Sequence, residues 1–201
     1  ILAMEFCTMG SLFQALYLEK RSRGAAAGSG HLIDPHRKRI ALGTAIGMEF
    51  LHRNGWAHFD ICSPNILLTQ DFDPKLADFG QARRAFGIGF PAVGHEAYRA
   101  PELCFTPSRN YQRSAHWTEK ADVYSFAILL WELLHKELPW SGSADIGRQV
   151  RIGARPPFKN EDMCPRQWRR LIRHSWEECP QDRPSFSVIV KTIEPDRKSV
   201  V

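Results

Sequence analysis

An aspartate and an asparagine, Asp60 and Asn65, lie five residues apart, and a second aspartate, Asp78, follows thirteen residues after the asparagine. Carboxylate and amide oxygens of this kind suit Mg²⁺, which is a hard cation. Two of these groups could hold the ion, which would leave the third to handle a proton. The plainer alternative is that Asp60 and Asp78 form turns by hydrogen-bonding to their own backbone.

Short apolar runs flank these three residues. Residues 66–68 and 76–77 predict small strands joined by a turn over 71–74, whereas residues 79–97, with four glycines and no clear period, predict a loop. Residues 1–7 resemble the end of a buried strand. The rest predicts a helical body, with helices over residues 12–18, from Asp34 to Leu51, 121–134, 167–176 and 186–193.

The composition excludes several classes of protein. With 201 residues, 43% hydrophobic and 24% charged, the chain can bury one core, so a disordered or fibrous protein is excluded. No apolar run is long enough to cross a membrane. The five cysteines are never spaced as Cys-x-x-Cys, which favours a reducing, cytoplasmic setting. The net charge of +5 favours acidic or phosphate-bearing partners, although the arginines of residues 166–173 are expected to be a solvated helix face.

The order of several motifs resembles a known family. Residues 58–68, Asp78-Phe79-Gly80 and Ala100-Pro101-Glu102 are similar to the catalytic loop, the magnesium loop and the A-P-E motif of eukaryotic protein kinases. The residues of these motifs most resemble those of the tyrosine-kinase-like serine/threonine kinases. This resemblance implies an α+β, protein-kinase-like fold: a mostly α-helical C-terminal lobe with a few short strands. It assigns residues 1–195 to the kinase domain and 196–201 to a tail.

The resemblance also implies roles for individual residues. Asp60 would be the catalytic residue that accepts or orients the proton of the substrate hydroxyl, and Asn65 and Asp78 would hold Mg²⁺. The nucleotide, ATP, would lie against residues of the hinge, the next helix and a strand: Met4, Glu5, Cys7, Ser11 and Leu67.

Further residues would have structural roles in such a lobe. His58 and Phe79 would stack on each other and be anchored by Asp122. Glu102 would form an ion pair with Arg183. The presence of both residues is consistent with the resemblance, because a buried carboxylate without a partner is energetically costly.

The sequence departs from the family pattern in its N-terminal lobe. No Gly-x-Gly-x-x-Gly loop and no strand lysine come before the hinge, so the N-terminal lobe is expected to be largely absent from this chain. By itself the chain is then expected to bind nucleotide poorly and to transfer nothing.

The catalytic and activation loops depart from the pattern as well. Phe59, Cys62 and Pro64 occupy positions where kinases carry a cation, and losing one such donor typically slows a reaction about 10²–10³-fold. Residues 81–99 contain no Ser or Thr, and their only Tyr is Tyr98, so no activating phosphorylation is expected there. His95 could partly replace the missing cation if Asp60 keeps it protonated, or it could be a solvent-facing loop residue.

Three functions remain open at this stage. The first is a protein kinase that transfers phosphoryl groups from Mg·ATP to Ser or Thr (or Tyr) hydroxyls of protein substrates. The second is a pseudokinase that binds nucleotide or serves as a scaffold, which the cation-free catalytic loop favours. The third, a basic RNA-associated module, is weak because aromatic residues do not regularly interleave the arginines, and we expect no nucleic-acid partner.

Overall fold

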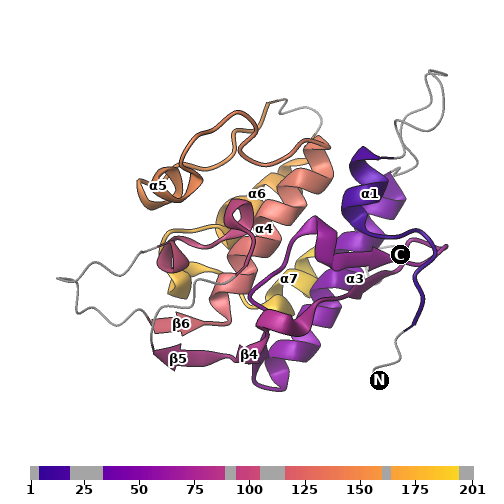
Figure 1. Ribbon diagram of the computed structural model, residues 1–201, viewed down its shortest axis with the longest axis horizontal. Helices are drawn as coiled ribbons and strands as arrows, with labels where there is room; N and C mark the ends of the chain where they lie inside the picture. The colour runs from indigo at the N-terminus through magenta and orange to yellow at the C-terminus, as the bar shows by residue number, and fades with distance from the viewer. Residues whose placement is uncertain (1–4, 19–33, 89–93, 105–115, 160–163, 195–201) are drawn as a thin grey trace, which may run out of the picture.

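The computed structural model describes residues 5–18, 34–88, 94–104, 116–159 and 164–194. Its centre is helix α4 (Lys120–His135), in which every residue from Ala121 to Leu133 is buried. The sequence of this helix is apolar on nearly all sides, so it is stable only when other elements surround it. Figure 1 shows α4 in the middle of the molecule, among the helices α3 (Asp34–Arg53), α6 (Arg166–Ser175) and α7 (Phe186–Ile193).

Within the described residues, three two-stranded antiparallel sheets accompany this helical body. Strand β1 (Trp56–Ala57) pairs with β4 (Arg83–Arg84), β2 (Ile66–Leu68) with β3 (Pro74–Leu76), and β5 (Phe86–Ile88) with β6 (His116–Thr118). In the β2–β3 pair, Ile66 lies opposite Leu76 and Leu68 opposite Pro74. The turn between these strands therefore brings the segments before β2 and after β3 side by side.

The remaining elements are short. Helix α1 (Leu12–Tyr17) begins with a capping box: the Ser11 hydroxyl accepts a hydrogen bond from Gln14 N, and the Gln14 side chain accepts one from Ser11 N. Helix α5 spans Ile146–Arg151. Five single-turn 3₁₀ helices complete the described elements: η1 (Ser63–Asn65), η2 (Phe79–Gln81), η3 (Glu96–Tyr98), η4 (Pro101–Leu103) and η5 (Pro180–Asp182).

The α+β class, mostly helical with a few short strands, is confirmed, and so are the predicted helices to within a few residues. The prediction of a loop over residues 79–97 was wrong in part, because η2, β4 and β5 lie within it and η3 overlaps its end. Strands β4 and β5 pair with residues 56–57 and 116–118, which are distant in the chain, so no local pattern could reveal them. Helix α5 was not predicted. Residues 1–4 of the strand expected near the start lie outside the described residues, and the described residues 5–7 form no strand.

The helices and the cysteines each allow one general statement. None of the helices described above has both the length and the apolar character needed to cross a membrane. The five cysteines are all free, and four of them are buried.

Candidate active site

The loop that carries Asp60 is anchored to α4 by one carboxylate. Asp122, which is fully buried, accepts hydrogen bonds from Phe59 N (2.7 Å), His58 N (2.8 Å) and His52 Nε2 (2.8 Å). It lies in the first turn of α4, where the helix dipole also favours a negative charge. Phe59 has a φ of 61°, which is an uncommon backbone conformation for a bulky residue. The hydrogen bonds from the backbone N–H groups of His58 and Phe59 to Asp122 hold it in that conformation.

The carboxylate of Asp60 is oriented by donors on both sides. Asn65 Nδ2 donates to Asp60 Oδ2 and to the Asp60 carbonyl oxygen, each at 2.9 Å, and the backbone N–H of His95 donates to Asp60 Oδ1 at 2.9 Å. Because the Asn65 amide directs its two hydrogens to Asp60, its own oxygen remains available as an acceptor. The Asp60 carboxylate is half-buried, so it can still meet a substrate.

Asp78 lies beside this loop because of the β2–β3 pairing. Ala77 N donates to Asn65 O at 2.9 Å, which places the residue after Ala77 next to the end of the catalytic loop. Asp78 adopts the left-handed conformation, with a φ of 57°, and its side chain accepts a hydrogen bond from Gly80 N at 3.2 Å. Its carboxylate is exposed and free to bind a further group.

The oxygen groups of Asn65 and Asp78 fit Mg²⁺ in their chemistry. Both are hard oxygen donors, and neither is committed to a protein cation. Among the described residues, no group of three His, Cys, Asp or Glu side chains is placed to hold a metal ion. Mg²⁺ is usually held by one or two protein ligands together with water and substrate phosphates.

His58 joins the two loops. Its Nε2 donates to Ala77 O at 3.1 Å, and its Nδ1 accepts a hydrogen bond from Asp60 N at 3.3 Å, which fixes the tautomer. Its ring contacts that of Phe79, with 5.0 Å between the ring centroids. The anchoring by Asp122, expected from the resemblance, is therefore present. The His58 and Phe79 rings are in contact as expected, but they are tilted by 50° and not stacked.

The predicted nucleotide-binding residues occupy two short segments of the structure. Met4 lies outside the described residues. Glu5 is exposed, and its carboxylate forms an ion pair with Lys75 Nζ at 2.9 Å. Cys7 is buried, and its carbonyl oxygen accepts a hydrogen bond from Gly10 N at 3.2 Å.

The other two predicted nucleotide contacts lie opposite each other. Ser11 and Leu67 form an isolated antiparallel bridge, which brings the start of α1 against β2. The Ser11 hydroxyl caps α1, so it already has a structural role. Leu67 is only half-buried, whereas its neighbours Ile66 and Leu68 are completely buried. Its side chain therefore faces the other side of β2, which is where a flat apolar ligand could rest.

A buried carboxylate that the sequence analysis did not single out lies beneath the catalytic loop. Glu132 of α4 is fully buried, and hydroxyl groups surround it. Its Oε1 accepts hydrogen bonds from Ser63 Oγ (2.8 Å) and Tyr17 Oη (3.0 Å), and its Oε2 accepts one from Tyr98 Oη (2.6 Å). Burial raises the pKa of Glu132, although these hydrogen bonds oppose the shift. The partners lie 34 to 115 residues away in the chain, which explains why no sequence spacing indicated them.

The residues that depart from the kinase pattern have structural explanations. Phe59 is buried, and the guanidinium of Arg83 lies 6.0 Å from the centroid of its ring. Cys62 is buried beside Asp60, and burial together with that carboxylate raises the pKa of its thiol to about 12, so it is an unreactive thiol. His95 reaches Asp60 through its backbone N–H, while its exposed imidazole packs edge-on against Tyr98.

The expected Glu102–Arg183 ion pair is present. Arg183 is 1% exposed, and its guanidinium donates to the two Glu102 carboxylate oxygens at 2.7 and 2.8 Å. The carbonyl oxygens of Lys120, Glu177 and Glu178 accept its remaining three hydrogens. Since all five donors of this buried cation are satisfied, the pair fixes the segment after the active-site loops onto the helical body.

Comparison with known proteins shows the family to which this chain belongs. A model of protein tyrosine and serine/threonine kinases matches residues 1–193. Similar proteins include the RGS domain-containing serine/threonine-protein kinase A of Dictyostelium discoideum, 37% identical, and the serine/threonine/tyrosine-protein kinase HT1 of Arabidopsis thaliana, 36% identical. Mitogen-activated protein kinase kinase kinase 12 of Rattus norvegicus is 32% identical.

The matches cover most of this chain but only part of each relative. They include 94%, 78% and 93% of this chain, and 16%, 39% and 19% of the three relatives, respectively. The family model also matches nearly the whole chain, and the matched residues include every site residue described above. The chain therefore belongs to the protein tyrosine and serine/threonine kinase family, as its motifs indicate.

Proposed function

We propose that this chain forms the catalytic-loop half of an ATP-dependent protein kinase that phosphorylates Ser or Thr hydroxyls of protein substrates. One observation carries the proposal: the carboxylate of Asp60 is held between Asn65 and the His95 amide, and the hydrogen bond from Ala77 N to Asn65 O brings Asp78 next to the end of the same loop. A scaffold has no chemical need for these three side chains together. The Dictyostelium discoideum relative, which is named as a serine/threonine-protein kinase, supports this substrate class.

In this mechanism, Asp60 orients the hydroxyl of the substrate and accepts its proton as the phosphoryl group moves. The hydrogen bonds from Asn65 and His95 fix the direction of its carboxylate, so little reorganisation is needed when the substrate arrives. Asn65 and Asp78 would hold Mg²⁺, which neutralises negative charge on the phosphates when it is bound. Cys7, through its backbone, and Leu67, through its side chain, would bind the adenine base.

The absence of a side-chain cation between His58 and Asn65 has a kinetic consequence in this proposal. One donor toward the developing charge is lost, so transfer is slower than in a kinase that keeps it, by about 10²–10³-fold. The His95 amide on Asp60 cannot replace that cation, because it binds the proton acceptor and not the phosphoryl group.

The test is transfer of labelled phosphate from Mg·ATP to a mixture of Ser-, Thr- and Tyr-containing peptides by the full-length gene product. Asp60→Asn removes the proton acceptor but keeps the shape of the side chain, and it should lower the rate at least about 10²-fold. Asp71→Asn, an exposed change in the turn between β2 and β3, is the matched control and should leave the rate unchanged. Equal rates for the wild type and Asp60→Asn, or no transfer by either, would refute the proposal.

A further inference from the structure

A second region with a distinct composition lies away from the catalytic loop, along α6 and the segment after α5. A pocket of about 640 Å³ is lined by Arg151, Ile152, Arg155, Arg173 and Trp176, and a neighbouring one of about 490 Å³ extends along α6 past Arg166, Arg169 and Arg170. The two share Arg173 and Glu177, so they form one continuous depression. We call it the arginine groove.

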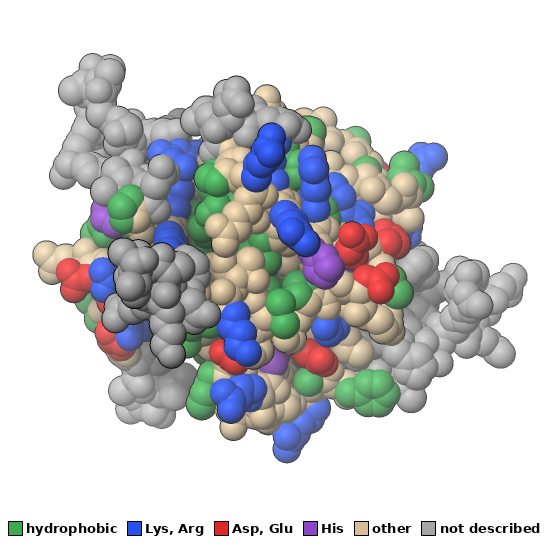
Figure 2. Space-filling view, turned by 180° about the vertical axis from the view of Figure 1, so that it is seen from behind, with side chains coloured by type: hydrophobic (Ala, Val, Ile, Leu, Met, Phe, Trp, Pro, Cys, Tyr) green, Lys and Arg blue, Asp and Glu red, His purple; other side chains and the backbone are tan. Residues whose placement is uncertain are grey.

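Figure 2 shows a face of the molecule on which Lys and Arg side chains gather, with Asp and Glu side chains in smaller groups beside them. The sequence of α6 explains why its own surface is basic. Its ten residues include four arginines and no acidic residue, so no ion pair can form within the helix. Arg166 with Arg170 and Arg169 with Arg173 are like-charged pairs four residues apart, which destabilises the helix. Two of these arginines also lie in its first turns, where the helix dipole disfavours a positive charge.

Among the described residues that line the two pockets, every Lys or Arg side chain is an arginine. A solvated face that serves only solubility has no need for that choice, because lysine carries the same charge. Arginine differs in presenting a planar fork that binds a carboxylate or phosphate through two parallel hydrogen bonds. The groove is therefore built for oriented anionic groups.

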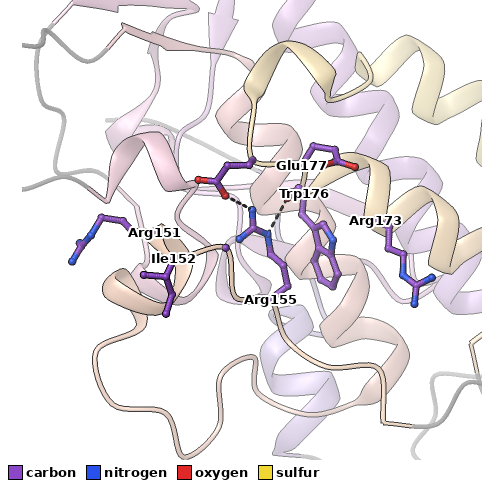
Figure 3. A pocket seen from close by; sticks show the side chains of 8 residues that line it. Arg151, Ile152, Arg155, Arg173, Trp176 and Glu177 are labelled. Carbon is purple, nitrogen blue, oxygen red and sulfur yellow. Dashed lines mark hydrogen bonds and ion pairs between the residues drawn. The ribbon is translucent and has the colours of Figure 1, made fainter.

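The walls of the groove have different roles. Figure 3 shows Arg151 and Arg173 toward opposite ends, with Arg155 and Trp176 between them. Arg155 is part of the structure, because it donates to Glu178 Oε2 and to Trp176 O, each at 2.9 Å. Arg173 is exposed, and its guanidinium stands over the ring of Phe158 at 5.3 Å from the centroid, which holds the side chain in place at the rim.

The floor between these cations is apolar. Ile152 is 75% exposed and supplies the apolar contact surface, whereas Trp176, beside Arg155, is buried. An exposed isoleucine flanked by arginines offers a contact to an apolar side chain as well as to charges. This combination of charged and apolar contacts suits an extended peptide. A membrane would require a broad apolar face, and RNA would require exposed aromatic rings on which its bases could stack. Glu177 and Glu178 at the edge also oppose a doubly charged phosphate more strongly than a carboxylate.

We propose that the arginine groove docks an Asp- and Glu-rich segment of a partner protein, with one apolar side chain of that segment resting against Ile152. The carboxylates would pair with Arg170 and Arg173 and, at the far end, with Arg151. The proposal does not depend on phosphoryl transfer, since its residues belong to neither the catalytic loop nor the predicted nucleotide site.

The experiment measures the fluorescence anisotropy of a labelled peptide, Glu-Asp-Glu-Leu-Glu-Asp-Glu, with the full chain. The peptide is expected to bind, more weakly as the salt concentration rises. Arg170→Glu combined with Arg173→Glu should weaken binding at least about tenfold, because it replaces attractions with repulsions. Ile152→Asp, at the other end of the groove, should weaken it as well. The matched control, Arg53→Glu with Lys191→Glu, changes the net charge equally at exposed sites outside the groove and should have little effect.

Three results would overturn the proposal. One is equal binding of a peptide in which Ser replaces every acid. Another is an equal loss of binding in the groove variants and in the control, which would indicate only the overall charge. The third is arginine-dependent binding that is tighter for a phosphopeptide, for anionic lipid vesicles or for single-stranded RNA than for the acidic peptide. Thermal unfolding of each variant shows whether it is folded, and Ile152→Asp provides an independent test should the double arginine variant unfold.

Discussion

Helix α4 carries two fully buried carboxylates, and their surroundings differ. Asp122, in the first turn, faces two backbone amides and a histidine ring, and the positive end of the helix dipole lies beside it. Glu132, in the last turn, faces three hydroxyl groups at the negative end of the same dipole. Burial raises the pKa of Glu132. One helix thus holds the front of the catalytic loop through amide donors and its back through hydroxyl donors.

The difference shows what kind of donor can sustain a buried charge. Backbone amides cannot turn away or find water, so removing their acceptor leaves them unsatisfied. Hydroxyl groups can rotate and can both donate and accept, so they tolerate a protonated carboxyl group. The Asp122 end should therefore be intolerant of change, and the Glu132 end should respond mainly to pH.

The largest effect is expected at the Asp122 end. Asp122→Ala leaves the amides of His58 and Phe59 and the His52 ring without their acceptor, and should lower the free energy of unfolding by about 3–5 kcal/mol. Urea denaturation measures it. Asp71→Ala, at an exposed turn, should change stability by less than about 0.5 kcal/mol. A loss at Asp122 as small as that would mean that the loop holds its own shape.

A smaller effect is expected where the loop meets Gly94. This residue has a φ of +80°, and a Cβ there would lie 2.4 Å from Phe59 O, so Gly94→Ala must displace the backbone that positions Asp60. Gly142 is the matched control, because its φ is +79° but no atom lies within 4 Å of its Cβ position. Both alanines meet the strain of a positive φ, about 1 kcal/mol, and only the first meets a clash, so we expect Gly94→Ala to cost about 1–2 kcal/mol more. Equal losses of stability would contradict the close packing of Gly94 against the loop.

The smallest effect concerns Glu132 and depends on pH. Because the folded pKa of Glu132 is raised above its ordinary value of 4.5, the protonated form stabilises the fold at low pH, and this contribution is lost as pH rises through the folded pKa. A glutamine at this position cannot ionise, so the stability of Glu132→Gln relative to the wild type should increase as pH rises above 4.5. Chemical denaturation across pH measures this trend, with the exposed Glu177→Gln as the control. A relative stability that falls with pH would mean that Glu132 is buried as a stabilised anion.

The sequence was informative where the evidence is local. The apolar run of α4 and the motif around Asp60 lie in continuous stretches, so the apolar pattern indicated the helix, and resemblance to a known family identified the motif. The hydroxyl groups around Glu132 come from Tyr17, Ser63 and Tyr98, which only the folded chain brings together. For the same reason, β4 and β5 were missed.

His95 illustrates a further limit of sequence reasoning. Its residue type drew attention to a charge, whereas the contact with Asp60 uses its backbone amide, which any residue except proline provides. Side-chain identity cannot indicate such a contact.

The central claim is that Asn65 and Asp78 serve one metal-bound nucleotide beside Asp60. Titration calorimetry of the full-length gene product with ATP, at increasing Mg²⁺, tests it most directly. The wild type should bind ATP more tightly when Mg²⁺ is present, and Asp78→Asn should lose at least about tenfold of that gain, or about 1.4 kcal/mol. Nucleotide binding that is indifferent to Mg²⁺ in the wild type, or an equal gain in Asp78→Asn, would contradict the account.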